Sequence, residues 1–125
     1  MSTVRGIRGA TTADANTKQS ILHATTEMLT ELVEANRLAV DDIAAAHFTT
    51  TQDLNAEFPA VAARLMGWEN VALMCGHEMA VPDAQPMCIR VMVLVNTEMS
   101  PGEIRNVYLR GAASLRDRGM ERPRP

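Results

Sequence analysis

The segment of residues 87–95, MCIRVMVLV, constrains the fold more than any other part of the chain, because its one charged residue is Arg90. A near-continuous apolar run of this length is typical of a β-strand that is covered on both of its faces. The loop before it, VPDAQP, contains two prolines, and Ser100, Pro101 and Glu103 after it form a helix-capping box. We therefore expect a sheet in which this strand is buried on both sides.

The other hydrophobic patterns predict an α+β domain with a mixed sheet of about five strands, one long helix and short helices. Apolar residues recur at helical spacing from residue 16 or 17 to about residue 36, which predicts the long helix. Further strands are expected over residues 3–10, 44–51 and 70–75, and short helices over residues 59–66 and from Ser100. Residues 104–109 fit either that last helix or a final strand. We expect one domain over residues 1–116 and a mobile tail over residues 117–125.

Length and charge exclude several classes of protein. A chain of 125 residues is long enough for one compact core. Its 12 basic and 15 acidic residues give a net charge of -3, so we expect no nucleic-acid partner. No window reaches the roughly 18 apolar residues of a membrane span, so we expect no membrane partner. The two cysteines, Cys75 and Cys88, form no CxxC pair, which favours a cytoplasmic protein with reduced thiols.

Arg90 needs an anionic partner if its strand is buried, because an unpaired charge in an apolar interior is prohibitively costly. The partner is either a structural carboxylate or a bound ligand. Glu78 is the nearest candidate in the sequence, 12 residues before Arg90. If both side chains face a cavity, the guanidinium fork and the carboxylate would suit a ligand that carries charged and hydroxyl groups.

The remaining candidate groups give weaker indications. The three histidines, His23, His47 and His77, show no metal-ligand spacing, so no metal site is expected. Cys75 is either a nucleophile or a small buried apolar residue, and the second interpretation is favoured because no spacing indicates an activating histidine. The chain has 11 Arg and one Lys, which reflects either codon usage or a need for planar forks that bind carboxylates.

Four segments resemble the small monofunctional chorismate mutases of the trimeric AroH class: VRGIRGATT, DLNAEFPAVAARLMGWE, CIRVMVLVNT and EIRNVYLRGAASLR. The resemblance implies a homotrimer of α+β subunits whose sheets pack into a pseudo-barrel, with active sites in the clefts between subunits. A trimer of this kind would cover the apolar strand. The implied activity is the [3,3] rearrangement of chorismate to prephenate in the biosynthesis of phenylalanine and tyrosine. It requires no cofactor, no metal and no covalent intermediate.

The resemblance also implies roles for individual residues. Arg90 would donate a hydrogen bond to the ether oxygen of chorismate, Arg8 and Tyr108 would bind a carboxylate, and Glu78 would accept from the hydroxyl group. Cys75 would lie at the wall of the cleft beside Glu78. Other lining residues would be Leu73, Met74, Gly76 and His77 near Cys75, Phe58, Ala60 and Arg64 from the neighbouring subunit, and Leu115 and Arg116 at the mouth.

Two departures from the family pattern affect the outer part of the cleft. Val61 stands where a lysine is common, which removes one cation from the neighbour's side, and Arg116 is followed by Asp117 where proline is usual. Two other functions remain open at this point. The chain could be an imine hydrolase of the Rid type, which has a similar trimeric fold, or a non-catalytic trimeric module that binds carboxylates.

Overall fold

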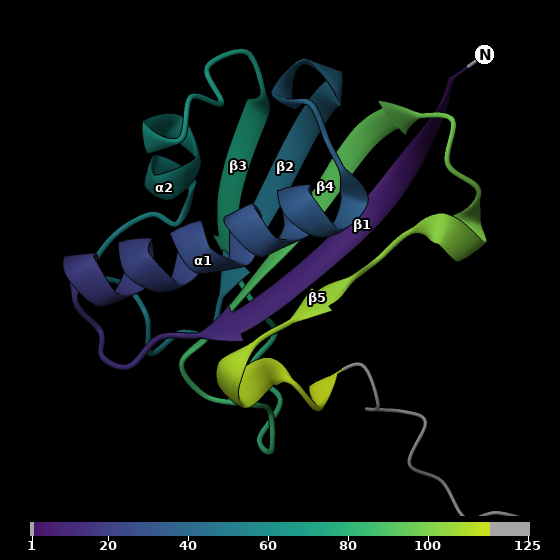
Figure 1. Ribbon diagram of the computed structural model, residues 1–125. Helices are drawn as coiled ribbons and strands as arrows, with labels where there is room; N and C mark the ends of the chain where they lie inside the picture. Colours follow the sequence, from purple (N-terminus) through teal and green to yellow (C-terminus); the bar gives the residue numbers. More distant parts are fainter. Residues whose placement is uncertain (1, 116–125) are drawn as a thin grey trace, which may run out of the picture.

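A computed structural model describes residues 2–115 and contains a five-stranded mixed sheet (Figure 1). The strands are β1 (Thr3–Thr12), β2 (Ile43–Thr50), β3 (Ala72–His77), β4 (Cys88–Thr97) and β5 (Val107–Tyr108), in the spatial order β3-β2-β4-β1-β5. The apolar strand β4 lies at the centre and pairs antiparallel with both β1 and β2. The edge strands β3 and β5 run parallel to β2 and β1. The predicted mixed sheet of five strands is confirmed.

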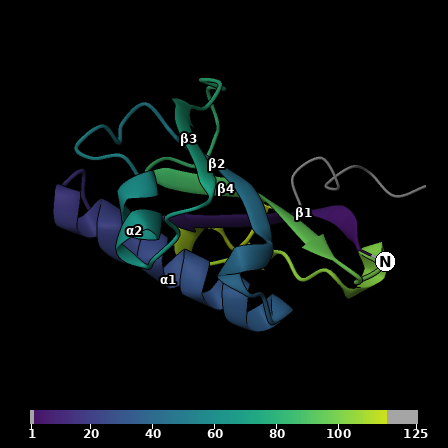
Figure 2. The ribbon, with the colours of Figure 1, turned by 90° about the horizontal axis from the view of Figure 1, so that it is seen from above.

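Two helices pack on one face of this sheet. The long helix α1 (Lys18–Asn36) runs across the strands, and the short helix α2 (Ala60–Leu65) lies beside it (Figures 1 and 2). The Thr17 hydroxyl caps α1 by accepting from the backbone N–H of Ser20 at 3.1 Å. Its apolar stripe includes Ile21, Met28 and Leu32, which are fully buried in the main core. The predicted long helix is therefore confirmed to within two residues.

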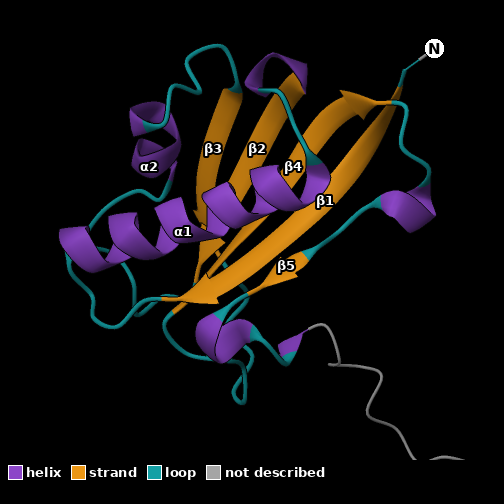
Figure 3. Ribbon diagram, viewed as in Figure 1, coloured by secondary structure: helices purple, strands orange, loops and turns teal. Residues whose placement is uncertain are grey.

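The opposite face of the sheet, here called the open face, lies away from α1 and α2 (Figures 2 and 3). Side chains alternate along β4, so that Val91 and Val93 are buried toward α1 whereas Met92 and Leu94 are 41% and 40% exposed. The prediction that this strand is buried on both faces is wrong for the single chain. One layer of helices covers one face, and no element within residues 2–115 covers Met92 and Leu94 on the other.

The ends of the short helices coincide with residues that favour turns. Helix α2 ends before Gly67, whose φ of 92° is a left-handed value that glycine adopts without strain. The capping box of Ser100 and Glu103 starts a single 3₁₀ turn, Pro101–Glu103, and two further turns span Val40–Asp42 and Arg110–Ala112. The ambiguous segment 104–109 contains strand β5.

Some predicted boundaries differ from the structure. Strand β3 extends through Gly76 and His77, beyond the predicted end at residue 75, because both residues pair with β2. Met87 lies outside β4 with a φ of 54°. The predicted tail, residues 117–125, lies outside the described residues. None of the helices within residues 2–115 is long and apolar enough to cross a membrane.

Candidate active site

The open face brings polar side chains from four strands into two neighbouring rows. Residues that pair directly across two strands point to the same face of a sheet. One row contains Tyr108, Ala10, Arg90, Thr49 and Gly76, in that order across β5, β1, β4, β2 and β3. The adjacent row contains Arg8, Met92, His47 and Met74. Side chains that are far apart in the sequence therefore meet on one surface.

Arg90 and Glu78 form a bidentate ion pair at this surface. The Nε atom of Arg90 lies 2.5 Å from Oε2 of Glu78, and its Nη2 atom lies 2.7 Å from Oε1. The Glu78 backbone N–H donates to the carbonyl of Thr50 at 2.8 Å, which fixes the residue that follows β3. The predicted pairing is confirmed. The Arg90 side chain is 48% exposed, however, so its expected complete burial is wrong for a single chain with an open face.

The ion pair keeps both partners charged. The hydrogen bond from Arg90 lowers the pKa of Glu78, partial burial opposes this shift, and a hydrogen bond from the Thr49 hydroxyl lowers it further. The same carboxylate raises the pKa of Arg90. Glu78 is therefore an ionised hydrogen-bond acceptor near neutral pH, beside a permanently charged donor.

A cavity of about 320 Å³ opens above this pair. Five of the predicted site residues line it, namely Arg8, Glu78, Arg90, Tyr108 and Leu115. The segment after β5 folds over one end of the open face, where Ala10, Cys88 and Ala112 form a small apolar cluster that Tyr108 and Leu115 contact. The amide oxygen of Asn106 accepts from the Arg8 backbone N–H at 2.8 Å and holds β1 beside the chain that enters β5. The structure thus brings these five residues together.

Two further residues with polar side chains line the same cavity and were not predicted as site residues, His47 and Thr49. Both lie on β2, which the sequence predicted only as a strand over residues 44–51. Their alternation along β2 places them on one face, but the sequence alone does not show that β2 lies next to β4. The register of the two strands, in which Thr49 pairs with Arg90, supplies the missing information.

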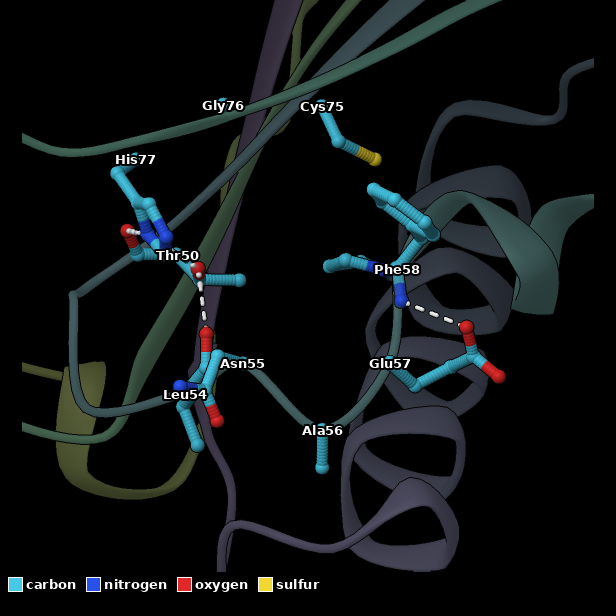
Figure 4. Close-up of a pocket in the computed structure, with 10 residues that line it drawn as sticks. Thr50, Leu54, Asn55, Ala56, Glu57, Phe58, Cys75, Gly76 and His77 are labelled. Carbon is cyan, nitrogen blue, oxygen red and sulfur yellow. Dashed lines mark hydrogen bonds between the residues drawn. The ribbon is translucent and has the colours of Figure 1, made fainter.

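A second cavity of about 320 Å³ lies near the N-terminal end of α2, and its lining includes Phe58, Cys75, Gly76 and His77 (Figure 4). The sulfur of Cys75 points toward the Phe58 ring in this view. Cys75 pairs with the buried Phe48 and therefore faces the helix layer, on the other side of β3 from Gly76. In one chain, Cys75 does not lie beside Glu78, contrary to the prediction.

The other predicted residues lie mostly on the side of Cys75. Ala60 begins α2 and is buried, and Arg64 is exposed on the same helix. Leu73 packs against the main core, whereas Met74 is 66% exposed on the open face. Arg116 lies outside the described residues. The predicted site residues therefore form two groups on one chain, one around Arg90 and one around Phe58.

Neither thiol is prepared to act as a nucleophile. Burial raises the pKa of Cys75, and burial raises that of Cys88 to about 11, so both are protonated near neutral pH. Between residues 2 and 115, no group of three or more His, Cys, Asp or Glu side chains is arranged to hold a metal ion.

Three comparisons with known proteins point to the same family. The sequence pattern of the family "Chorismate mutase type I" matches residues 4–118. A chorismate mutase AroH of Thermus thermophilus is 45% identical over 114 residues, which cover 90% of this chain and 93% of that protein. The chorismate mutase AroH of Bacillus subtilis is 41% identical, with 90% of each chain covered. The solved structure of a chorismate mutase from Clostridium thermocellum superposes with a TM-score of 0.85 at 50% identity and covers 86% of this chain and 96% of that one.

Proposed function

The chain belongs to the chorismate mutase type I family and isomerises chorismate to prephenate, and we propose that it does so in the cavity around Arg90 and Glu78. The observation that carries this proposal is the bidentate ion pair of these two residues, in a cavity that Arg8 and Tyr108 also line. This activity belongs to the biosynthesis of aromatic amino acids. The family match and the relatives favour neither of the two alternative functions, imine hydrolysis and non-catalytic carboxylate binding.

The rearrangement breaks the ether bond of chorismate, and negative charge develops on the ether oxygen as the bond lengthens. The hydrogen bonds to Glu78 use the N–H of Nε and one N–H of Nη2, so both N–H groups of Nη1 and the second N–H of Nη2 remain for this oxygen. A donor held in place beforehand interacts more strongly with the charged transition state than with the neutral ether, which lowers the barrier. The chemistry needs no nucleophile, which suits a site whose cysteines are protonated.

The other groups of the cavity bind and orient the substrate. Arg8 and Tyr108 lie at the β1 and β5 side of Arg90, where they can hold one carboxylate of chorismate. The ionised Glu78 carboxylate can accept a hydrogen bond from the substrate hydroxyl, because a carboxylate has more lone pairs than its present partners use. Fixing both ends of the flexible molecule favours the folded geometry that reacts.

A second subunit would complete the site. The open face exposes Val4 (58%), Met92, Leu94 and Met74, and Phe58 is 66% exposed at the edge of the second cavity. We propose a homotrimer in which the open faces pack together, and in which Phe58, Ala60, Arg64 and Cys75 of one subunit approach the Arg90 cavity of the next. Clustered exposed apolar residues of this kind mark interaction surfaces in soluble proteins. The two free cysteines, Cys75 and Cys88, suit the cytoplasmic location that we propose for the enzyme.

Turnover of chorismate by the purified protein tests this function. We expect loss of the ultraviolet absorbance of chorismate and formation of prephenate with no added cofactor, at an unchanged rate in the presence of a metal chelator. An imine hydrolase would leave chorismate intact and release ammonia from an imine substrate. A binding module would bind chorismate without consuming it, and loss of activity on chelation would contradict the mechanism.

A further inference from the structure

We propose that Thr49 is a positioning residue for the rearrangement, because its hydroxyl group fixes the Glu78 carboxylate that in turn orients Arg90. This inference rests on the proposed function of the Arg90 cavity and adds to it a residue that does not need to touch chorismate. It makes the catalytic arginine the last member of a chain of three hydrogen-bonded side chains from β2, the end of β3 and β4.

The geometry of the three side chains supports this order. The Thr49 hydroxyl donates to Oε2 of Glu78, the same oxygen that accepts from Nε of Arg90. Oε1 of Glu78 accepts from Nη2 of Arg90. The carboxylate is therefore held from two sides, by the arginine that it orients and by a threonine on a separate strand.

The strand positions explain why Thr49 can serve as the fixed member. Thr49 lies on β2, an interior strand that pairs on one side with β4 and on the other with β3. It pairs directly with Arg90 across β4 and with Gly76 across β3, two residues before Glu78. Glu78 itself follows the last residue of an edge strand. Without the hydroxyl, Arg90 and Glu78 would hold only each other, and the pair could move together.

The charges around Glu78 agree with this role. The hydrogen bond from Thr49 is one of the interactions that lower the pKa of this carboxyl, after the larger contribution of Arg90. Other titratable or charged groups near it are His47 on β2 and Cys88 on β4, with Arg8 on β1 and Tyr108 on β5 lining the same cavity. Of these groups, His47 also lowers the pKa of Glu78, as Thr49 does. His47 is kept in all of the variants below, so its effect on this pKa is the same in each of them.

Three variants separate positioning from structural support. Thr49→Val has a similar shape and lacks the hydroxyl group, Thr49→Ser keeps the hydroxyl, and Thr11→Val is the matched control. Thr11 is fully buried on β1, pairs with the buried Ile89, and its hydroxyl has no hydrogen-bond partner among residues 2–115. Its replacement removes a threonine hydroxyl from the same sheet without touching Glu78. If Thr49→Val does not fold, Thr49→Ala takes its place in the comparison with Thr49→Ser.

The measurement is the pH profile of kcat/KM for chorismate, with a thermal melt of each preparation. For Thr49→Val we expect kcat/KM to fall about 3- to 10-fold at neutral pH, the size of one net hydrogen bond. Because the lost bond favoured the ionised carboxylate, the acidic limb of the profile should move to higher pH, by up to about one unit. Thr49→Ser and Thr11→Val should keep the wild-type limb.

Wild-type kcat/KM and an unmoved limb in Thr49→Val would overturn the role of Thr49 while leaving the proposed function intact. An equal loss in Thr49→Ser and Thr49→Val, with the limb unmoved, would also overturn it, because the hydroxyl would then not matter. If the wild-type protein does not consume chorismate, the proposed function fails first and this inference fails with it.

Discussion

Arg90→Lys should give a folded enzyme that has lost most of its kcat, by about 10²- to 10³-fold, with a smaller change in KM. Arg90 uses two nitrogens for Glu78 and offers a third to the substrate, all in one plane. A lysine ammonium is a single centre on a different stem, so it cannot hold Glu78 in this bidentate way and also meet the ether oxygen. The loss should appear in kcat because the interaction is strongest in the transition state. Steady-state turnover of chorismate measures kcat and KM, and a thermal melt of the same preparation shows whether the variant is folded.

Two further variants test whether this loss is specific to Arg90. Arg90→Ala should be at least as damaging, because it also leaves Glu78 without its cation. Arg105→Lys makes the same chemical change at an exposed arginine that does not line the Arg90 cavity, and it should keep the wild-type kcat. Near-normal kcat in folded Arg90→Lys would show that Arg90 only neutralises Glu78, and the proposed mechanism would fail.

Leu94→Glu should convert the proposed trimer into a folded monomer with little activity. Leu94 lies at the middle of the open face, where it pairs with Gly6 on β1 and Ala45 on β2, and it is 40% exposed in one chain. A glutamate there is tolerated while the face meets water, but an unpaired charge buried in a subunit interface costs several kcal/mol. Sedimentation should show a trimer for the wild type and a monomer for Leu94→Glu, and chorismate turnover should fall with assembly.

Ala35→Glu is the matched control, because it places the same charge at an exposed position of α1, the helix on the other face of the sheet. We expect this variant to remain trimeric and active. A fully active monomer, either as the wild type or as Leu94→Glu, would contradict the proposal that a second subunit completes the site.

Local patterns were sufficient to predict most of the fold. The apolar run around Val93 identified the central strand, and the helical stripe that begins at residue 16 or 17 identified α1. These features are encoded by near neighbours in the chain, so the sequence displays them directly. Coverage of β4 is a different kind of property, because it depends on which elements pack on each face. Met92 and Leu94 are apolar and yet exposed, because neither helix of the described chain packs on their face of the sheet.

Site residues that belong to a family motif could be predicted from the sequence. Site residues that are placed only by the pairing of two strands could not. The resemblance identified Arg8, Glu78, Arg90 and Tyr108, and the structure places all four around one cavity. Thr49 carries no motif, and only its pairing with Arg90 places its hydroxyl beside Glu78. Cys75 lies three residues before Glu78, but the alternation of side chains along β3 turns it toward the helix layer. Closeness in the sequence was misleading there, because successive strand residues face opposite sides of the sheet.

Mixing two impaired variants tests most directly whether the active site is shared between subunits. Arg90→Ala removes the donor on one side of the proposed site, and Arg64→Ala removes the exposed cation that the neighbour would contribute. Each variant alone should turn over chorismate poorly. When the two are co-expressed in equal amounts and assemble at random, about a quarter of the sites in a symmetric trimer should receive both intact halves. Recovery to about a quarter of the wild-type rate per subunit is therefore the expected result, and a mixed preparation no more active than the average of the two variants would show that each chain carries its site alone.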